Sequence, residues 1–173
     1  MDFNLSENQI MIAQMLRDFA EKEIKPFMKQ WDDDEYFPID TMKKLGDLGL
    51  LGIFIPEEYG GSGFSYDEYA SAIMELGKVC GGVGLSVAAH NSLCTGHIYY
   101  HGSEEQKQRF LPKLTSGEFI GAWGLTEPNT GSDAMRMKTT AVKDGNDRII
   151  NGAKNWITHG LSGDVAVVLV RTG

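Results

Sequence analysis

The sequence predicts an α+β protein in which an N-terminal all-α domain precedes a truncated antiparallel β-barrel or β-sandwich domain. Up to about residue 115, apolar residues recur at helical spacing and three helix-capping boxes follow one another. Beyond that point, short β-branched and aromatic runs alternate with turns that contain Gly or Asn. This change places the expected domain boundary between residues 115 and 116, with domains at 1–115 and 116–173.

The composition excludes several classes of function. Of the 173 residues, 42% are hydrophobic and 23% are charged, which is typical of a globular protein that buries a core of its own. The net charge of −8 argues against a nucleic acid or an anionic membrane surface as partner. No apolar run is long enough to span a membrane. Cys80 and Cys94 lack the spacing of metal or redox motifs, so we expect two buried thiols in a reducing compartment.

The first helix is expected to begin after Ser6, because Ser6 and Gln9 form an S-x-x-Q capping box. Apolar residues then recur every three to five positions as far as Trp31, as on one face of a long helix. Pro26 is expected to kink this helix, because proline removes a backbone hydrogen bond. The acidic run at residues 32–35 is expected to be solvated loop.

A short helix is expected over about residues 40–48. The segment LGIFIPEEYGGSG that follows is expected to be extended and then to turn. A capping box of Ser65 and Glu68 opens a helix that runs to about Val79, and Gly81 and Gly82 are expected to break it.

An apolar helix is expected over about residues 84–101, with Gly102 closing it in the C′ position. A capping box of Ser103 and Gln106 opens the last helix, which is expected to stop at Gly117. Four strands are then expected, in the runs EFIGAWGL, KTTAVKDG, RIINGAKNWIT and DVAVVLVRT. Four strands are few for a closed sheet, so the β domain is expected to be incomplete.

Several familiar sites are disfavoured. The glycine-rich stretches at 60–65 and 81–86 complete neither a dinucleotide-binding motif nor a P-loop. His97 and His101 lie four apart on an expected helix with His90 on a similar face, but no intervening Glu or third ligand indicates a metal site. No G-x-S-x-G elbow indicates a serine nucleophile.

The segment WGLTEPNTGSD, residues 123–133, is the first candidate for a binding site. Glu127 precedes a proline and is therefore biased toward an extended conformation. Gly131 can adopt φ > 0 and would let a ligand approach the backbone closely. We expect a strand end whose Thr126 hydroxyl and backbone N–H groups face the edge of a flat heterocycle, before a corner that offers Ser132. A purely structural strand and turn is the alternative.

The segment NGAKNWITHG, residues 151–160, is the second candidate. Asn151 and Gly152 form a hairpin signal that leads into an expected strand. Trp156 and Thr158 are two apart on that strand and are expected to share a face. An indole can pack against an aromatic ring system, and a hydroxyl can donate to a ring nitrogen. A core Trp beside an incidental Thr is the alternative.

In this order and after a helical domain, the two segments resemble the acyl-CoA dehydrogenase family, and GLLGIFIPEEYGGSG and GSEEQKQRFLPKLTSGE support the resemblance. It covers essentially the whole chain. It implies an N-terminal helical domain, a middle β domain and a C-terminal four-helix domain, of which this chain corresponds to the first and about half of the second. It also implies bound FAD, between the middle domain and the C-terminal helices.

The resemblance implies contacts for both segments. Thr126 would meet the pyrimidine edge of the flavin, Trp156 would pack beside its ring system, and Thr158 would lie near N5. Ser132 would also reach the CoA part of the substrate, and Leu93 would line the acyl pocket. The implied cofactor-binding residues are Trp123, Gly124, Leu125, Thr126, Gly131, Ser132, Trp156, Ile157 and Thr158, and the implied substrate-binding residues are Ser132 and Leu93.

The implied reaction is α,β-dehydrogenation of an acyl-CoA thioester in fatty acid metabolism, in which a base removes the α-proton while a hydride leaves the β-carbon for flavin N5. Electrons would pass to an electron-transferring flavoprotein, and the full-length protein would be a homotetramer or a dimer. The family's catalytic Glu belongs to the C-terminal helices, so the base is expected to be missing here. The chain alone is expected to be inactive, as a fragment or as one of two polypeptides.

Two other interpretations stay open. An acyl-CoA oxidase-type flavin enzyme would differ in how fast its flavin is reoxidised by air. A flavin-free helical binding module would bind no flavin at all. The expected location is the cytoplasm or a compartment like the mitochondrial matrix, and the cytoplasm is favoured because no targeting segment is visible.

Overall fold

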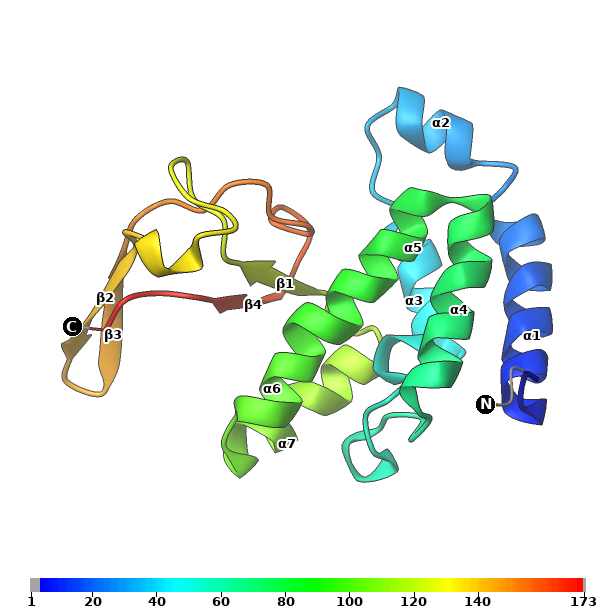
Figure 1. Ribbon diagram of the computed structural model, residues 1–173, viewed down its shortest axis with the longest axis horizontal. Helices are drawn as coiled ribbons and strands as arrows, with labels where there is room; N and C mark the ends of the chain where they lie inside the picture. The colour runs from blue at the N-terminus through cyan, green and yellow to red at the C-terminus, as the bar shows by residue number, and fades with distance from the viewer. Residues whose placement is uncertain (1–3, 173) are drawn as a thin grey trace.

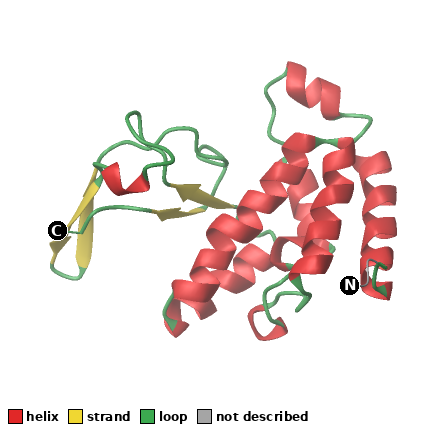
Figure 2. Cartoon of the chain, in the orientation of Figure 1, coloured by secondary structure: helices red, strands yellow, loops and turns green. Residues whose placement is uncertain are grey.

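The structure of the protein, a computed structural model, describes residues 4–172. Helices fill one side of the molecule and the β region the other, with α1 and the β2–β3 hairpin at opposite ends (Figures 1 and 2). The elements in chain order are α1 (Glu7–Glu23), α2 (Met28–Asp33), α3 (Ile39–Asp47), the short 3₁₀ turns η1 (Leu50–Gly52) and η2 (Glu57–Tyr59), α4 (Tyr66–Val79), α5 (Gly81–Ala88), the π-helical η3 (Ala89–Thr95), α6 (Gly96–His101), α7 (Glu104–Thr115), β1 (Gly121–Gly124), the 3₁₀ turn η4 (Ala134–Arg136), β2 (Thr140–Asp144), β3 (Asp147–Asn151) and β4 (Val165–Val168).

The three predicted capping boxes are confirmed at the starts of α1, α4 and α7. In each box, the serine side chain accepts a hydrogen bond from the backbone N–H group of the third helical residue, and that residue's side-chain oxygen accepts one from the serine N–H group. The serines satisfy N–H groups that would otherwise lack a partner inside the helix. These three helices therefore begin where the sequence predicts, directly after Ser6, Ser65 and Ser103.

The prediction of a single kinked helix before residue 32 is wrong, because the chain forms two helices there. α1 ends at Glu23 and α2 begins at Met28, with Pro26 in the turn between them. Pro26 has no N–H group to continue the ladder, so the chain breaks instead of bending. The acidic run is solvated as expected, although its first two residues belong to the end of α2 and only the last two lie in a turn.

Two other helical expectations need correction. The segment after α3 is not extended but coils into η1 and η2, and Gly49 (φ 78°) and Gly60 (φ 80°) supply the left-handed turns beside them. The helix predicted from residue 84 begins at Gly81, because the extended Cys80 separates it from α4. It then runs through the π-helical η3 to His101, and Gly102 ends it with an extended backbone (φ −72°) instead of a left-handed one.

A buried apolar core holds the helical part together. α1 packs along α4, and α4 packs on α5. The fully enclosed core side chains include Leu16, Ile24, Leu45, Leu51, Leu76, Leu111 and Leu114.

Among residues 4–172, no helix is both long and apolar enough to cross a membrane.

Within residues 4–172, the β region consists of two small, open sheets. β2 and β3 form an antiparallel hairpin with Val142 opposite Ile149, and its turn contains the left-handed Gly145 (φ 60°). β1 and β4 pair in parallel, with Gly121 opposite Val165, and not antiparallel as expected. Parallel pairing is possible because a long crossover that includes the hairpin connects them.

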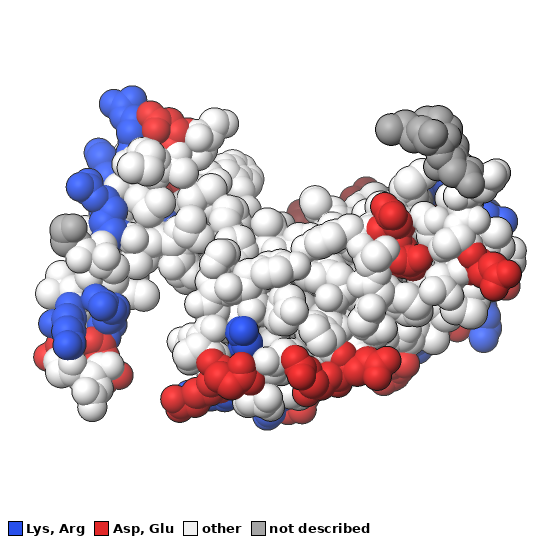
Figure 3. Space-filling model, turned by 60° about the horizontal axis from the view of Figure 1, so that its bottom comes forward, with Lys and Arg blue, Asp and Glu red and all other residues white. Residues whose placement is uncertain are grey.

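The net charge is unevenly distributed between the two parts. Residues 116–173 contain six basic and six acidic residues, so the whole net charge of −8 belongs to residues 1–115. Figure 3 shows acidic side chains gathered along the helical part and basic side chains on the β region. The helical surface is therefore the one that repels polyanions.

β1 is attached to the helical part at Gly121, through the imidazole of His90. The Gly121 N–H group donates to His90 Nδ1 (3.0 Å), and His90 Nε2 bonds the Leu114 carbonyl (3.0 Å). A Cβ atom on Gly121 would lie 2.6 Å from Cβ of Cys94, so only glycine allows this approach. Complete burial lowers the pKa of His90 to about 4, and the imidazole is neutral at pH 7.

Acidification is expected to destabilise the fold through His90. Its pKa is about 4 in the fold and 6.5 in the absence of burial. Between these values the unfolded chain binds a proton that the folded chain does not, so the free energy of unfolding falls as the pH falls. We expect His90 to lower it by about 3 kcal/mol between pH 7 and pH 4, as measured by urea unfolding at several pH values.

His90→Asn provides the control, because asparagine retains an acceptor for the Gly121 N–H group and does not titrate. The variant should show a shallower fall of the unfolding free energy over the same pH range. An equally steep fall in both proteins would contradict the assignment to His90.

Candidate functional site

The first candidate segment leaves β1 and folds back at a tight corner. The corner closes between Glu127 and Thr130, which exchange backbone hydrogen bonds of 2.9 and 3.1 Å. Pro128 and Asn129 lie exposed at its tip. The acidic residue before the proline therefore starts a turn, as the sequence predicts.

The carboxylate of Glu127 is enclosed and accepts hydrogen bonds from three groups. The donors are the backbone N–H groups of Lys138 (2.6 Å) and Thr139 (2.9 Å) and the ammonium group of Lys154 (2.8 Å). The Lys154 bond, together with the backbone bonds from Lys138 and Thr139, lowers the pKa of Glu127 to about 2. A carboxylate held in this way fixes the backbone around it and is a poor general base.

Lys154 joins the two candidate segments. Its ammonium group donates to the Leu125 carbonyl (2.9 Å) as well as to Glu127, and its side chain is 11% exposed. The next residue, Asn155, donates its backbone N–H group to the Thr126 carbonyl (2.9 Å). The two segments therefore lie side by side.

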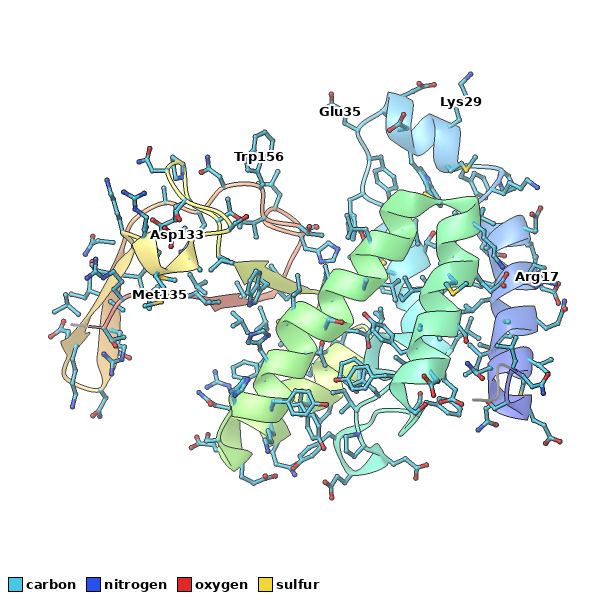
Figure 4. The ribbon with its side chains drawn as sticks, viewed as in Figure 1. Arg17, Lys29, Glu35, Asp133, Met135 and Trp156 are labelled. Carbon is cyan, nitrogen blue, oxygen red and sulfur yellow. The ribbon has the colours of Figure 1, made fainter. Side chains whose placement is uncertain are left out.

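Trp156 and Thr158 do not share a strand, so this part of the prediction is wrong. β3 ends at Asn151, and the expected hairpin at Asn151–Gly152 does not form. Trp156 has a left-handed backbone (φ 59°) and is 92% exposed, whereas Thr158 is half-buried in a turn. The Asn155 N–H group bonds Thr126 and not a neighbouring strand, which turns this part of the chain away from a ladder. Figure 4 shows the indole of Trp156 projecting from the β region.

Several predicted site residues have polar groups that remain available. Trp123 is half-buried beside His97, with ring centroids 5.7 Å apart, and its buried Nε1 has no partner among the described residues. Thr126 and Thr158 are half-buried, and the hydroxyl of neither has a hydrogen-bond partner within residues 4–172. These donors can serve a ligand without breaking a bond in the protein.

The other predicted residues vary in exposure. Gly131 has a backbone outside the left-handed region, contrary to expectation, and a Cβ atom there would meet nothing within 4 Å. Ser132 is exposed, Ile157 is half-buried, and Leu93 is half-buried on η3. Gly124 and Leu125 continue the backbone of β1 toward the corner.

No metal site forms among the described residues, where no three His, Cys, Asp or Glu side chains come together. His97 and His101 are ring neighbours at 5.6 Å, and His90 is used to attach β1. Both cysteines are free, but only Cys94 is buried, and burial raises its pKa to about 11. The expectation of two buried thiols is therefore wrong for the half-exposed Cys80.

Sequence reasoning missed three residues that shape the site. Lys154 lies inside the second quoted segment, yet its partner Glu127 is 27 residues away. His90 attaches β1 from η3. His159 donates from Nδ1 to the Gly121 carbonyl (2.8 Å). No local pattern reveals such contacts, because each depends on where the chain returns in space.

The sequence matches two family descriptions, acyl-CoA dehydrogenase, N-terminal domain, over residues 6–118, and acyl-CoA dehydrogenase, middle domain, over residues 122–173. The chain belongs to the acyl-CoA dehydrogenase family. The short-chain specific acyl-CoA dehydrogenase of Clostridium acetobutylicum is 47% identical over 172 residues. That alignment covers 99% of this chain and 45% of the relative, so the chain spans less than half of the relative's length.

Solved structures of the family superpose closely on the chain. A glutaryl-CoA dehydrogenase from Mycobacterium smegmatis in complex with FADH2 is 40% identical with a TM-score of 0.93, over 97% of this chain and 43% of that one. A structure described with the electron transferring flavoprotein of Acidaminococcus fermentans is 44% identical with a TM-score of 0.95, over 98% of this chain and 45% of that one. The predicted helical domain followed by a small, open β part is confirmed by these similarities.

Replacing Lys154 is expected to loosen the contact between the two segments. Lys154→Met keeps much of the side-chain length but leaves the enclosed Glu127 carboxylate without its charged partner, which is unfavourable. We expect a lower thermal unfolding midpoint and faster amide hydrogen exchange at Asn155. Lys143→Met, at an exposed position of β2, is the control and should change neither measurement. Equal midpoints for the two variants would contradict the role given to Lys154.

Proposed function

We propose that this chain forms the helical domain and one flavin-binding wall of an FAD-dependent acyl-CoA dehydrogenase, with domains at 1–115 and 116–173. The observation that supports this most strongly is the junction of the two candidate segments through Lys154, within a chain that belongs to this family. Bound FAD would supply the two-electron acceptor for α,β-dehydrogenation of an acyl-CoA thioester.

The residues present fit a flat, acceptor-rich ring system. The hydroxyls of Thr126 and Thr158 and the indole N–H group of Trp123 are donors without protein partners in the described chain. The exposed indole of Trp156 offers an apolar face on which an aromatic ring can pack. Gly124, Leu125, Gly131, Ser132 and Ile157 complete the proposed wall.

Donors at this wall would act by stabilising negative charge. A ring system that accepts two electrons gathers charge along its nitrogen and carbonyl edge, and fixed donors favour that state. Thr126 and Thr158 would orient the ring through their hydroxyls. Trp156 would exclude water from one face.

Ser132 and Leu93 are the proposed substrate contacts. Ser132 is exposed just beyond the corner, where it can bond the polar CoA portion. Leu93 is half-buried on η3 and can pack against an acyl chain. The relative from C. acetobutylicum is short-chain specific, which supports a short acyl group.

The catalytic base is proposed to lie outside this chain. Glu127 is committed to three hydrogen bonds, and Glu118 is exposed and paired with Lys113 (2.9 Å). The relatives are more than twice as long as the matched region, which leaves room for the base elsewhere. The chain alone is therefore expected to be inactive.

The proposal extends to the cellular setting of the enzyme. We propose an electron-transferring flavoprotein as acceptor, supported by the similar structure from A. fermentans. We also propose that the full-length enzyme is a homotetramer or a homodimer, that it acts in fatty acid metabolism and that it lies in the cytoplasm.

A chimera tests the proposed function. Residues 1–173 are fused to the part of the C. acetobutylicum relative that follows its matched region, and the intact relative is the positive control. We expect a yellow protein whose flavin absorption bleaches on addition of butyryl-CoA and recovers slowly in air. A folded but colourless chimera would favour the flavin-free binding module. Rapid peroxide formation would favour an oxidase.

Thr158→Val tests the proposed flavin contact in that chimera. Valine has nearly the same shape but lacks the hydroxyl, so one hydrogen bond of about 1 kcal/mol is lost. We expect flavin reduction by butyryl-CoA to slow about fivefold in stopped-flow measurements. Thr140→Val, on the exposed part of β2, should leave the rate unchanged. Equal rates in the two variants would remove Thr158 from the site.

A further inference from the structure

An imidazole bonds each of the two backbone polar groups of Gly121. The N–H group donates to His90 Nδ1 (3.0 Å), and the carbonyl accepts from His159 Nδ1 (2.8 Å). The neighbouring bonds of β1 go to the other side, since the Ile120 carbonyl accepts from Val165 and the Gly124 carbonyl from Leu169. The two imidazoles therefore occupy the edge of β1 that faces away from β4.

The hydrogen bonds determine the tautomer of each ring. A carbonyl oxygen only accepts, so Nε2 of His90 carries the proton that it donates to Leu114, which leaves Nδ1 free to accept from Gly121. By the same rule, Nδ1 of His159 carries the proton. His90 is completely buried and His159 is 7% exposed, so water does not compete for these bonds.

Three parts of the proposed site come together at this glycine. His90 lies on η3, three residues before Leu93. Gly121 begins the strand that leads to Trp123 and Thr126. His159 directly follows Thr158, so its bond fixes one end of the Trp156–Thr158 turn, while the Asn155 bond to Thr126 fixes the other.

We propose that His90 and His159 are positioning residues that set the flavin-binding strand and the Trp156–Thr158 turn at a fixed distance from the helix that carries Leu93. The inference rests on the proposed function, because it concerns how the rings of cofactor and substrate would be held relative to each other. Small misplacements of reacting groups reduce rates strongly, so an enzyme of this kind needs such a junction.

Two substitutions at His159 separate positioning from general stability. In His159→Asn, the amide nitrogen replaces Nδ1 and can donate to Gly121, and asparagine tolerates the left-handed backbone (φ 63°) of this position. In His159→Gly, the backbone also remains unstrained but the donor is lost. Both variants lose the ring contact with Phe37 (centroids 5.0 Å apart), and His159→Asn alone keeps a side chain that can donate to Gly121.

The first experiment uses the 173-residue chain without any cofactor. We expect ¹⁵N NMR of the imidazoles to show a proton on Nε2 of His90 and on Nδ1 of His159. Amide exchange of Asn155 and Gly163, whose N–H groups donate to the Thr126 and His159 carbonyls, should accelerate at least about tenfold in His159→Gly and stay near the original rate in His159→Asn. The opposite tautomer at either ring, or equal exchange in both variants, would overturn the proposal whatever the chain binds.

The second experiment places the same substitutions in the chimera. With FAD bound, His159→Gly should slow flavin reduction about tenfold or more, and His159→Asn should restore it to within about twofold. Equal rates in both variants would overturn the positioning role. A chimera that binds no FAD even with His159 intact would refute the proposed function, while the exchange and tautomer measurements would still decide whether the two imidazoles hold Gly121.

Discussion

The enclosed contact between Glu127 and Lys154 is the interaction on which the β region depends. In the described part of the chain, the sheets there have two strands each, and two-stranded sheets are marginally stable in water. The hydrogen bonds accepted by the Glu127 carboxylate and donated by the Lys154 ammonium group take the place of more extensive strand pairing. They hold together the corner, the residues just before β2 and the segment at residues 151–160. The spatial arrangement of this region is thus set by side chains bonded to backbone, more than by strand pairing.

The helical part supplies the fixed support for that arrangement. Its core is apolar and continuous, and η3 brings His90 and Cys94 directly against β1. The missing Cβ of Gly121 lets the strand approach the helix closely. Close packing of this kind transmits displacements, because interiors have few voids to absorb them. A shift of η3 would therefore move the strand and the residues that follow it.

The sequence predicted the elements whose causes are local. Capping boxes at Ser6, Ser65 and Ser103 depend on side chains three residues apart, and all three were located correctly. The sequence predicted strands in the β region but not how they pair, because the partner of β1 is β4, about forty residues later. The prediction that Trp156 and Thr158 share a face is wrong for the same reason, since a hydrogen bond from the Asn155 N–H group to the Thr126 carbonyl replaces the expected strand pairing. In the site, the two segments were recognised, but Lys154 and the histidines that hold them were not.

Trp156 presents a large apolar surface to water on a backbone that is held in place. Trp156 is 92% exposed, so an apolar surface that covers its indole gains free energy by removing that area from water. Its backbone is already held on both sides, at Asn155 by Thr126 and at His159 by Gly121. Covering the indole with a ring would therefore release water from apolar surface while ordering little additional backbone, and preorganisation of this kind favours binding. Under the proposed function, the same two bonds that keep Trp156 out of a strand would hold it ready to receive a flat ligand.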